Sequence, residues 1–245
     1  MNGPTMDQFV KPDPTRAALL TIDVQNDVLD GGTLEVRGTS QTLPAIAAVV
    51  GAFRARARPI VHVVRLYRPD GSNVDLCRRA SVKAGLVAFC PGTPGSQLAA
   101  VLYPQPGCKL DSEQLLAGNF QALSPNEHVM YKSRWGAFFE TNLVKHLRER
   151  KINTVVIAGA NFPNCPRSTA YQASERDFRV VLLQDAVSGL YDRGIEEMKA
   201  IGVSVARAGE WMEAITKPGS GDVSPESQRE LDTNLFRARA APTLK

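Results

Sequence analysis

The pattern of apolar and polar positions divides the chain into two alternating kinds of segment. Short apolar, β-branched runs such as "NTVVIAG" are typical of buried parallel strands, and longer runs with apolar residues three or four positions apart are typical of helices. The pattern predicts strands at 17–23, 59–64, 128–132, 153–159, 179–186 and 202–207, and helices at 43–58, 137–150, 166–178 and 192–201. In the helix at 137–150, we expect Phe139, Leu143 and Leu147 to share one apolar face. Strands that alternate with helices predict an α/β fold: a three-layer α/β/α sandwich with a mainly parallel, doubly wound central sheet.

Composition predicts one domain with two flanking segments. A chain of 245 residues suits one large domain, which we place at 17–216. Residues 1–16 are interrupted by proline and predict an N-terminal arm, whereas residues 217–245 predict a polar C-terminal tail. Residues 68–127 hold much of the proline and glycine, so we expect an excursion of loops and short helices over the sheet edge.

Charge and residue spacing argue against several classes of function. The formal net charge is +4, from 29 basic and 25 acidic residues mixed along the chain, so we expect no nucleic-acid partner. No apolar run reaches membrane-spanning length and the start lacks the pattern of a secretion signal, so we expect a cytoplasmic protein with no membrane partner. The four cysteines have no CxxC spacing, and the three histidines form no HxH, HExxH or HxxxH pair. We therefore expect neither a disulfide framework nor a zinc site.

Three reactive side chains come at the ends of predicted strands. Asp23 ends the first strand, Lys132 ends the third, and Cys165 follows the fourth. Because ligands bind at the carboxyl ends of parallel strands, we expect the three side chains to meet at one edge of the sheet. Cys165 lies between two prolines where a helix begins, and the positive end of the helix dipole should lower the pKa of its thiol. A base beside a thiol and a cation to hold the thiolate are what a cysteine nucleophile needs.

The same residues lie in segments that resemble a known family. The segments "LLTIDVQNDVLDGG", "YKSRWGAFFETNL" and "TVVIAGANFPNCPRSTAYQASERDFRVVLLQDAVSG" are similar to motifs of the isochorismatase-like cysteine hydrolases, and the match spans roughly 17–206. The resemblance implies that Asp23 is the general base, Lys132 the electrostatic partner and Cys165 the nucleophile. The family includes nicotinamidases, carbamoylsarcosine and maleamate amidases, and ureidoacrylate, biuret and triuret hydrolases.

The resemblance also implies an oxyanion hole and allows a comparison of pockets. In the family a cis peptide bond precedes the cysteine, here Ala160–Asn161, and it turns the N–H groups of Asn161 and Cys165 toward the substrate carbonyl. Nicotinamidases hold a metal through an Asp-x-His pair and a further histidine, but the corresponding segment "HVVRLYRPDGSN" has no such pair. We therefore expect His62 to be a core or supporting residue, and we expect no metal and no cofactor. The family often has phenylalanine at the position of Val28, so we expect a wider pocket here.

Together these features predict a cysteine hydrolase that cleaves a C–N bond of a small linear amide, ureido compound or imide through a thioester. The alternatives are an esterase with the same three residues, a binding or scaffold protein without turnover, and a redox thiol protein, which would lack a resolving CxxC cysteine. We expect a small-molecule substrate and water as partners, in a homodimer or homotetramer. The candidate substrate contacts are Gln25, Asn26, Trp135 and Phe138, with Arg68, Arg134 and Arg167 as partners for a substrate carboxylate. Core packing and solvated arginines are the structural alternatives for these seven residues.

Overall fold

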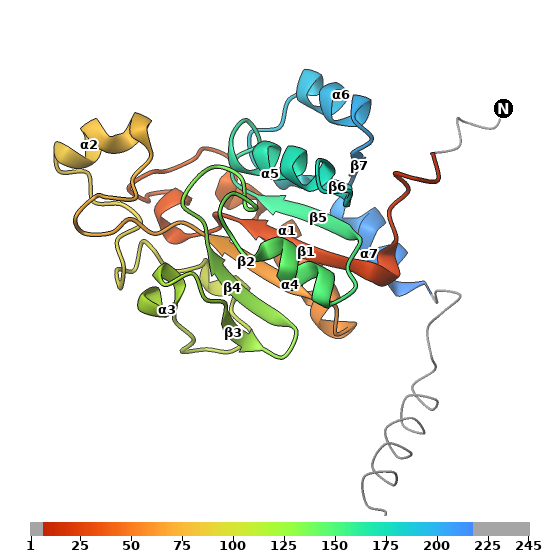
Figure 1. Cartoon of the computed structure of the whole chain (residues 1–245), viewed down its shortest axis with the longest axis horizontal. Helices are drawn as coiled ribbons and strands as arrows, with labels where there is room; N and C mark the ends of the chain where they lie inside the picture. The colour runs from red at the N-terminus through yellow and green to blue at the C-terminus, as the bar shows by residue number, and fades with distance from the viewer. Residues whose placement is uncertain (1–6, 218–245) are drawn as a thin grey trace, which may run out of the picture.

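A seven-stranded sheet forms the centre of the protein in the computed structural model, which describes residues 7–217 (Figure 1). The strand order is β3-β4-β2-β1-β5-β6-β7, and neighbouring strands are parallel except for the β3–β4 pair. The strands are β1 (Ala17–Ile22), β2 (Ile60–Val64), β3 (Gln121–Ser124), β4 (Glu127–Tyr131), β5 (Thr154–Gly159), β6 (Arg179–Val187) and β7 (Ser204–Ala206). All residues of the three central strands β2, β1 and β5 are buried, which fits a parallel sheet covered on both faces.

Helices cover both faces of the sheet, as the three-layer prediction requires (Figure 1). The helices are α1 (Thr39–Ala55), α2 (Arg79–Lys83), α3 (Ser112–Leu116), α4 (Leu143–Glu149), α5 (Cys165–Ser174), α6 (Asp192–Ala200) and α7 (Ala208–Thr216). Successive residues of β1 face opposite layers: Leu19 belongs to the apolar cluster of α1 and α7, and Leu20 belongs to that of α4, α5 and α6. The two-residue period of a strand thus places one apolar cluster on each side of the sheet. The predicted α/β/α sandwich with a mainly parallel sheet is confirmed.

Two helices begin at other residues than predicted. α1 begins at Thr39, before its predicted start, and follows Gly38, whose φ of +89° suits glycine. α4 begins at Leu143, after its predicted start, because Glu140 has a φ of +50° that a helix cannot contain. Phe139 therefore lies in a turn and is 39% exposed, so the expectation that it shares the apolar face of α4 is wrong.

The segment 68–127 holds a strand that the sequence did not predict. Besides loops, α2 and α3, it contains short 3-10 helices at Leu76–Arg78 and Ala100–Leu102, and it ends in the antiparallel pairing of β3 with β4. The residues of β3, "QALS", are only partly buried and carry little apolar signal. The division into arm, domain and tail stays a prediction, since residues 1–6 and 218–245 lie outside the described residues. Within 7–217, no helix is both long enough and apolar enough to span a membrane.

Candidate active site

The backbone of β2 fixes two of the three predicted catalytic residues at one edge of the sheet. β1 and β4 flank β2, and Asp23 and Lys132 directly follow these two strands. The N–H of Asp23 donates to Val63 O at 2.9 Å, and the N–H of Lys132 donates to Val64 O at 3.0 Å. Parallel pairing therefore brings together two side chains that are 109 positions apart in the sequence.

Cys165 reaches the same edge from the other side of β1. β5 pairs with β1 along its whole length, and Cys165 is the first residue of α5, with Asn164 as the N-cap. The predicted position at a helix start is therefore confirmed. Gly159 ends β5 with a φ of +118°, and a Cβ at this position would lie 2.2 Å from Ile22 O, so only glycine fits.

The connection from β5 to α5 contains no cis peptide bond. The expected cis bond between Ala160 and Asn161 is wrong, because every peptide bond in residues 7–217 is trans. A trans bond is favoured by about 3 kcal/mol at a non-proline residue, and the positive φ of Gly159 supplies a sharp turn without a cis bond. The N–H groups of Asn161 and Cys165 donate no hydrogen bond within the described chain, so both are available to a ligand. Their role as an oxyanion hole stays a prediction.

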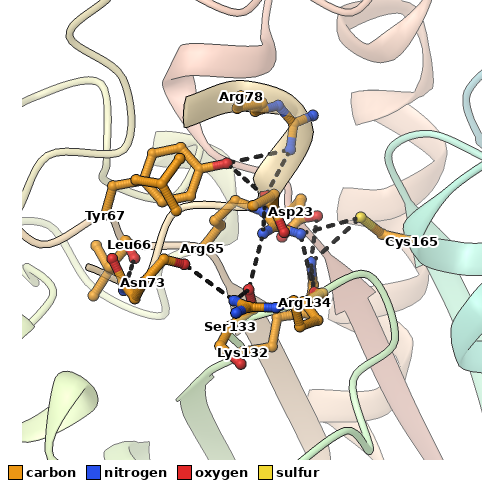
Figure 2. Close-up of polar contacts among 12 residues, drawn as sticks. Asp23, Arg65, Leu66, Tyr67, Asn73, Arg78, Lys132, Ser133, Arg134 and Cys165 are labelled. Atoms are coloured by element: carbon orange, nitrogen blue, oxygen red, sulfur yellow. Dashed lines mark hydrogen bonds and ion pairs between the residues drawn. The ribbon is translucent and has the colours of Figure 1, made fainter. Parts of the chain in front are cut away.

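The three predicted catalytic side chains are in contact, as Figure 2 shows. Lys132 Nζ donates to Asp23 Oδ2 at 2.8 Å and to Cys165 Sγ at 3.4 Å. It also donates to the backbone carbonyl of Arg134 at 3.2 Å. All three side chains are buried, and Lys132 is completely so. Asp23 Oδ1 has no hydrogen-bond partner among the residues that the structure describes, so this oxygen can accept a proton.

Burial and neighbouring charges shift the pKa values of Asp23 and Cys165 in opposite directions. Burial alone would raise the pKa of Asp23, but the cations of Lys132 and Arg65 outweigh it and hold that pKa below its ordinary value. Burial and the Asp23 carboxylate raise the pKa of Cys165, and the two cations offset this only in part. The expectation that the helix terminus lowers the thiol pKa is therefore wrong, since desolvation is the larger effect. At neutral pH the site holds a carboxylate beside a thiol, which is the protonation state a general base requires.

Arg65 is a fourth member of the site that the sequence reasoning missed. Its Nη2 donates to Cys165 Sγ at 3.7 Å and to Arg134 O at 3.0 Å (Figure 2). Its Nη1 forms an ion pair with Asp75 at 2.7 Å. Arg65 directly follows β2. The rule that selected Asp23 and Lys132, a polar residue at the carboxyl end of a strand, would have found it as well.

Two of the predicted substrate contacts, Gln25 and Asn26, hydrogen-bond to backbone groups. The Gln25 side chain is fully buried, donates to Arg65 O at 2.9 Å and accepts from Arg65 N at 2.8 Å. Its amide is thus buried and fully hydrogen-bonded to backbone groups, so the expectation that Gln25 contacts the substrate is wrong. Asn26 donates to Pro94 O at 2.8 Å but is only half-buried, so a substrate contact at Asn26 stays a prediction.

The two predicted aromatic contacts have different surroundings. The Trp135 ring lies 5.2 Å from the guanidinium of Arg65 and 4.9 Å from that of Arg78, so it borders the site. Phe138 is buried, and its ring centroid lies 5.8 Å from that of Phe178. These contacts favour the packing alternative for Phe138, whereas a substrate contact at Trp135 stays a prediction.

The three candidate arginines form no polar contact with the carboxylate or the thiol of the site through their side chains. Arg68 is exposed and donates to Leu116 O, and Arg167 forms an ion pair with Glu197 at 2.6 Å. The Arg134 guanidinium donates to backbone carbonyls, and it is the carbonyl of Arg134 that contacts Lys132 and Arg65. These contacts favour the structural alternative for Arg68 and Arg167, and the pairing of the three arginines with a substrate carboxylate stays a prediction.

The segment after β2 does not suit a metal ion. His62 is fully buried and hydrogen-bonded to Thr21 at 2.7 Å and Glu127 at 2.8 Å, which confirms it as a core residue. Among residues 7–217, no three His, Cys, Asp or Glu side chains group as a metal site would require. The thiol accepts hydrogen bonds from the cations of Lys132 and Arg65, and a metal ion at the sulfur would be repelled by both. Val28, at the position where a wider pocket is expected, packs in a small apolar cluster, and the pocket width stays a prediction.

Comparisons with known proteins identify the family of this chain. A family model of the isochorismatase domain matches residues 17–210. A protein named probable inactive nicotinamidase from Arabidopsis thaliana is 32% identical over 207 residues, which cover 81% of this chain and 95% of that protein. Ureidoacrylate amidohydrolase RutB of Methylobacterium radiotolerans is 29% identical over 197 residues, with coverages of 75% and 71%. The crystal structure of an isochorismatase family protein from Desulfovibrio vulgaris, 31% identical, has a TM-score of 0.69 and coverages of 82% and 99%. The resemblance drawn from the three motifs is thus confirmed, and the chain belongs to the isochorismatase family.

Proposed function

We propose that this protein is a cysteine amidohydrolase that cleaves a C–N bond of a small linear amide, ureido compound or imide. Family membership and the amidohydrolases among its relatives support hydrolysis of a non-peptide amide. The observation that carries the finer proposal is the contact of one buried lysine with both the carboxylate and the thiol. A cation that touches both groups can hold negative charge on either of them while a proton moves between them.

The proposed reaction begins with transfer of the Cys165 thiol proton to Asp23 and proceeds through a thioester. Asp23 Oδ1 takes the proton from Cys165 Sγ, and the sulfur attacks the substrate carbonyl carbon. The oxyanion that forms accepts hydrogen bonds from the N–H groups of Asn161 and Cys165. Its collapse breaks the C–N bond, and the leaving nitrogen takes the proton from Asp23. Water then gives a proton to Asp23 and attacks the thioester, and the sulfur leaves and regains that proton as a thiol.

One comparison favours a second candidate function. A relative at 32% identity is named probable inactive, so a scaffold without turnover is the competing proposal. This chain has an aspartate, a lysine and a cysteine in mutual contact, and a scaffold has no need of this buried arrangement of charges. We therefore favour the enzyme over the scaffold.

An ammonia-release screen over small amides, ureido compounds, imides and matched esters tests the proposal. The wild type should release ammonia from at least one compound, Cys165→Ser should release almost none, and Cys77→Ser, a change at an exposed cysteine, should match the wild type. Ester cleavage without amide cleavage would favour the esterase. No turnover across the panel, with the protein folded, would favour the scaffold.

A further inference from the structure

The Arg65 side chain is buried and its backbone is held on both sides. The guanidinium group lies inside the protein, and the residue as a whole is 1% exposed. The amide of Gln25 hydrogen-bonds to both the N–H and the carbonyl of Arg65. This double contact replaces the strand pairing that ends with β2, so the start of the side chain is fixed in position.

The guanidinium group itself is oriented by several partners. Nη1 pairs with Asp75, which also accepts a hydrogen bond from Tyr67 at 2.8 Å and pairs with Arg78 at 3.1 Å. The ring of Trp135 lies 5.2 Å from the guanidinium carbon. Burial opposes the charge, but Asp23, Cys165 and Asp75 raise the pKa of Arg65 above its ordinary value, so the group stays a cation. The second terminal nitrogen, Nη2, is thereby held at the sulfur.

We propose, on the basis of the proposed cysteine chemistry, that Arg65 is a second catalytic cation, whose Nη2 stabilises the negative charge on Cys165 Sγ after Asp23 has taken the thiol proton. In this transfer the S–H bond breaks, an O–H bond forms at Asp23 Oδ1, and the negative charge moves from the carboxylate to the sulfur. Lys132 donates to both atoms that exchange the charge. Arg65 donates to the Cys165 sulfur but not to the Asp23 carboxylate. Its hydrogen bond to the sulfur therefore strengthens as the negative charge moves to the sulfur. Asp75 is then a positioning residue that aims the guanidinium.

The competing explanation is that Arg65 serves only to neutralise Asp75. A buried arginine can compensate the charge of a buried carboxylate whether or not a thiol lies beside it. The two explanations differ in one measurable property, the ionisation of Cys165. Loss of a catalytic cation makes the thiolate harder to form, whereas loss of a merely structural ion pair leaves the thiol unchanged.

The test is the pH dependence of Cys165 alkylation by iodoacetamide, followed by peptide mass spectrometry to separate this cysteine from the other three. The variants are Arg65→Gln, the paired change Arg65→Gln with Asp75→Asn, and Arg65→Lys. The paired change removes both charges and avoids a buried Asp75 that has only Arg78 as its cation, so it can be measured even if Arg65→Gln alone does not fold. Arg54→Gln is the matched control, because it breaks a comparable ion pair with the buried Glu127, at 2.6 Å, on another part of the sheet.

We expect the alkylation midpoint to move to higher pH by about one unit or more in Arg65→Gln, and in the same direction in the paired change. Arg65→Lys should shift less, because an ammonium cannot reach both the sulfur and Asp75 as the planar fork does. Arg54→Gln should keep the wild-type midpoint. If the folded variants at position 65 also keep the wild-type midpoint, the proposal is overturned. Because alkylation needs no substrate, a shifted midpoint together with an empty substrate screen would sustain the role of Arg65 in thiol ionisation and refute the proposed amidohydrolase.

Discussion

Replacement of Lys132 by methionine tests the charge balance at the centre of the site. Methionine has a similar length and no charge, so Lys132→Met keeps most of the packing. It removes the ion pair with Asp23 at 2.8 Å and the contact with Cys165 at 3.4 Å. Asp23 would then be a buried carboxylate that has lost one of the two cations holding its pKa down, and Arg65 would remain.

The magnitude follows from the burial of the pair. Removal of one partner of a buried ion pair typically costs about 3–5 kcal/mol, because the other charge is left uncompensated. Arg65 remains close to Asp23, so we expect the lower end, about 3 kcal/mol. For a protein of this size, about 3 kcal/mol corresponds to a fall in Tm of roughly 10 °C.

The loss of stability should depend on pH in a defined direction. The pKa of Asp23 is lowered in the folded protein, so its ion pair contributes stability above the unfolded pKa of about 3.9 and loses it as the pH falls through the folded pKa. The gap between wild type and Lys132→Met should therefore be full at neutral pH. It should narrow at acidic pH, where Asp23 becomes protonated in the variant.

Thermal unfolding at a series of pH values measures this gap, with the double variant Asp23→Asn and Lys132→Met as the control. The double variant removes both charges, so it should recover most of the lost stability. It should stay inactive, since it has no base. An equal Tm for Lys132→Met and wild type at neutral pH would refute the argument that loss of Lys132 leaves the buried charge of Asp23 without sufficient compensation.

Three further predictions follow from the site. Cys165→Ser should fold normally and lose turnover by at least about 100-fold, and the wild type should show an acyl adduct on its Cys165 peptide by mass spectrometry during turnover. Exhaustive EDTA treatment should leave the rate unchanged, and a loss restored by zinc, manganese or iron would show that residues 62–73 have been misinterpreted. Arg167→Gln breaks a partly exposed ion pair with Glu197, so we expect a Tm change under about 3 °C and an unchanged KM for carboxylate-bearing substrates. A raised KM there would place Arg167 at the substrate.

Most of the fold could be predicted because its strands are buried on both faces. Such strands appear in the sequence as short, continuous apolar runs. The first and last residues of β1, β2 and β5 lie within one residue of their predicted positions. β3 has no such pattern, because an edge strand is stabilised by its pairing with β4 more than by burial. The late start of α4 depends on the positive φ of Glu140, a local choice for which the sequence gives no strong signal.

The candidate site could be predicted where a residue type and a strand end coincide, as they do at Asp23 and Lys132. The directions of the candidate side chains could not be predicted, because they depend on contacts with segments that are distant in the sequence. Gln25 follows Asp23 closely in sequence, but its amide is held by Arg65 and by Ser96 O at 2.6 Å. The thiol pKa was predicted in the wrong direction for a related reason: the helix terminus is visible in the sequence, and the depth of burial is not.

The charges of the site are compatible with the proposed chemistry inside the protein. Asp23, Asp75, Arg65 and Lys132 are all buried, and they amount to two negative and two positive charges. Burial of a net charge costs several kcal/mol, whereas a balanced and hydrogen-bonded set costs far less. In the proposed reaction, transfer of the thiol proton from Cys165 to Asp23 moves a negative charge from the carboxylate to the sulfur and creates no new charge. The net charge of the buried groups is therefore zero before and after the transfer. The two cations already donate hydrogen bonds to the sulfur, so they can stabilise the negative charge there without moving.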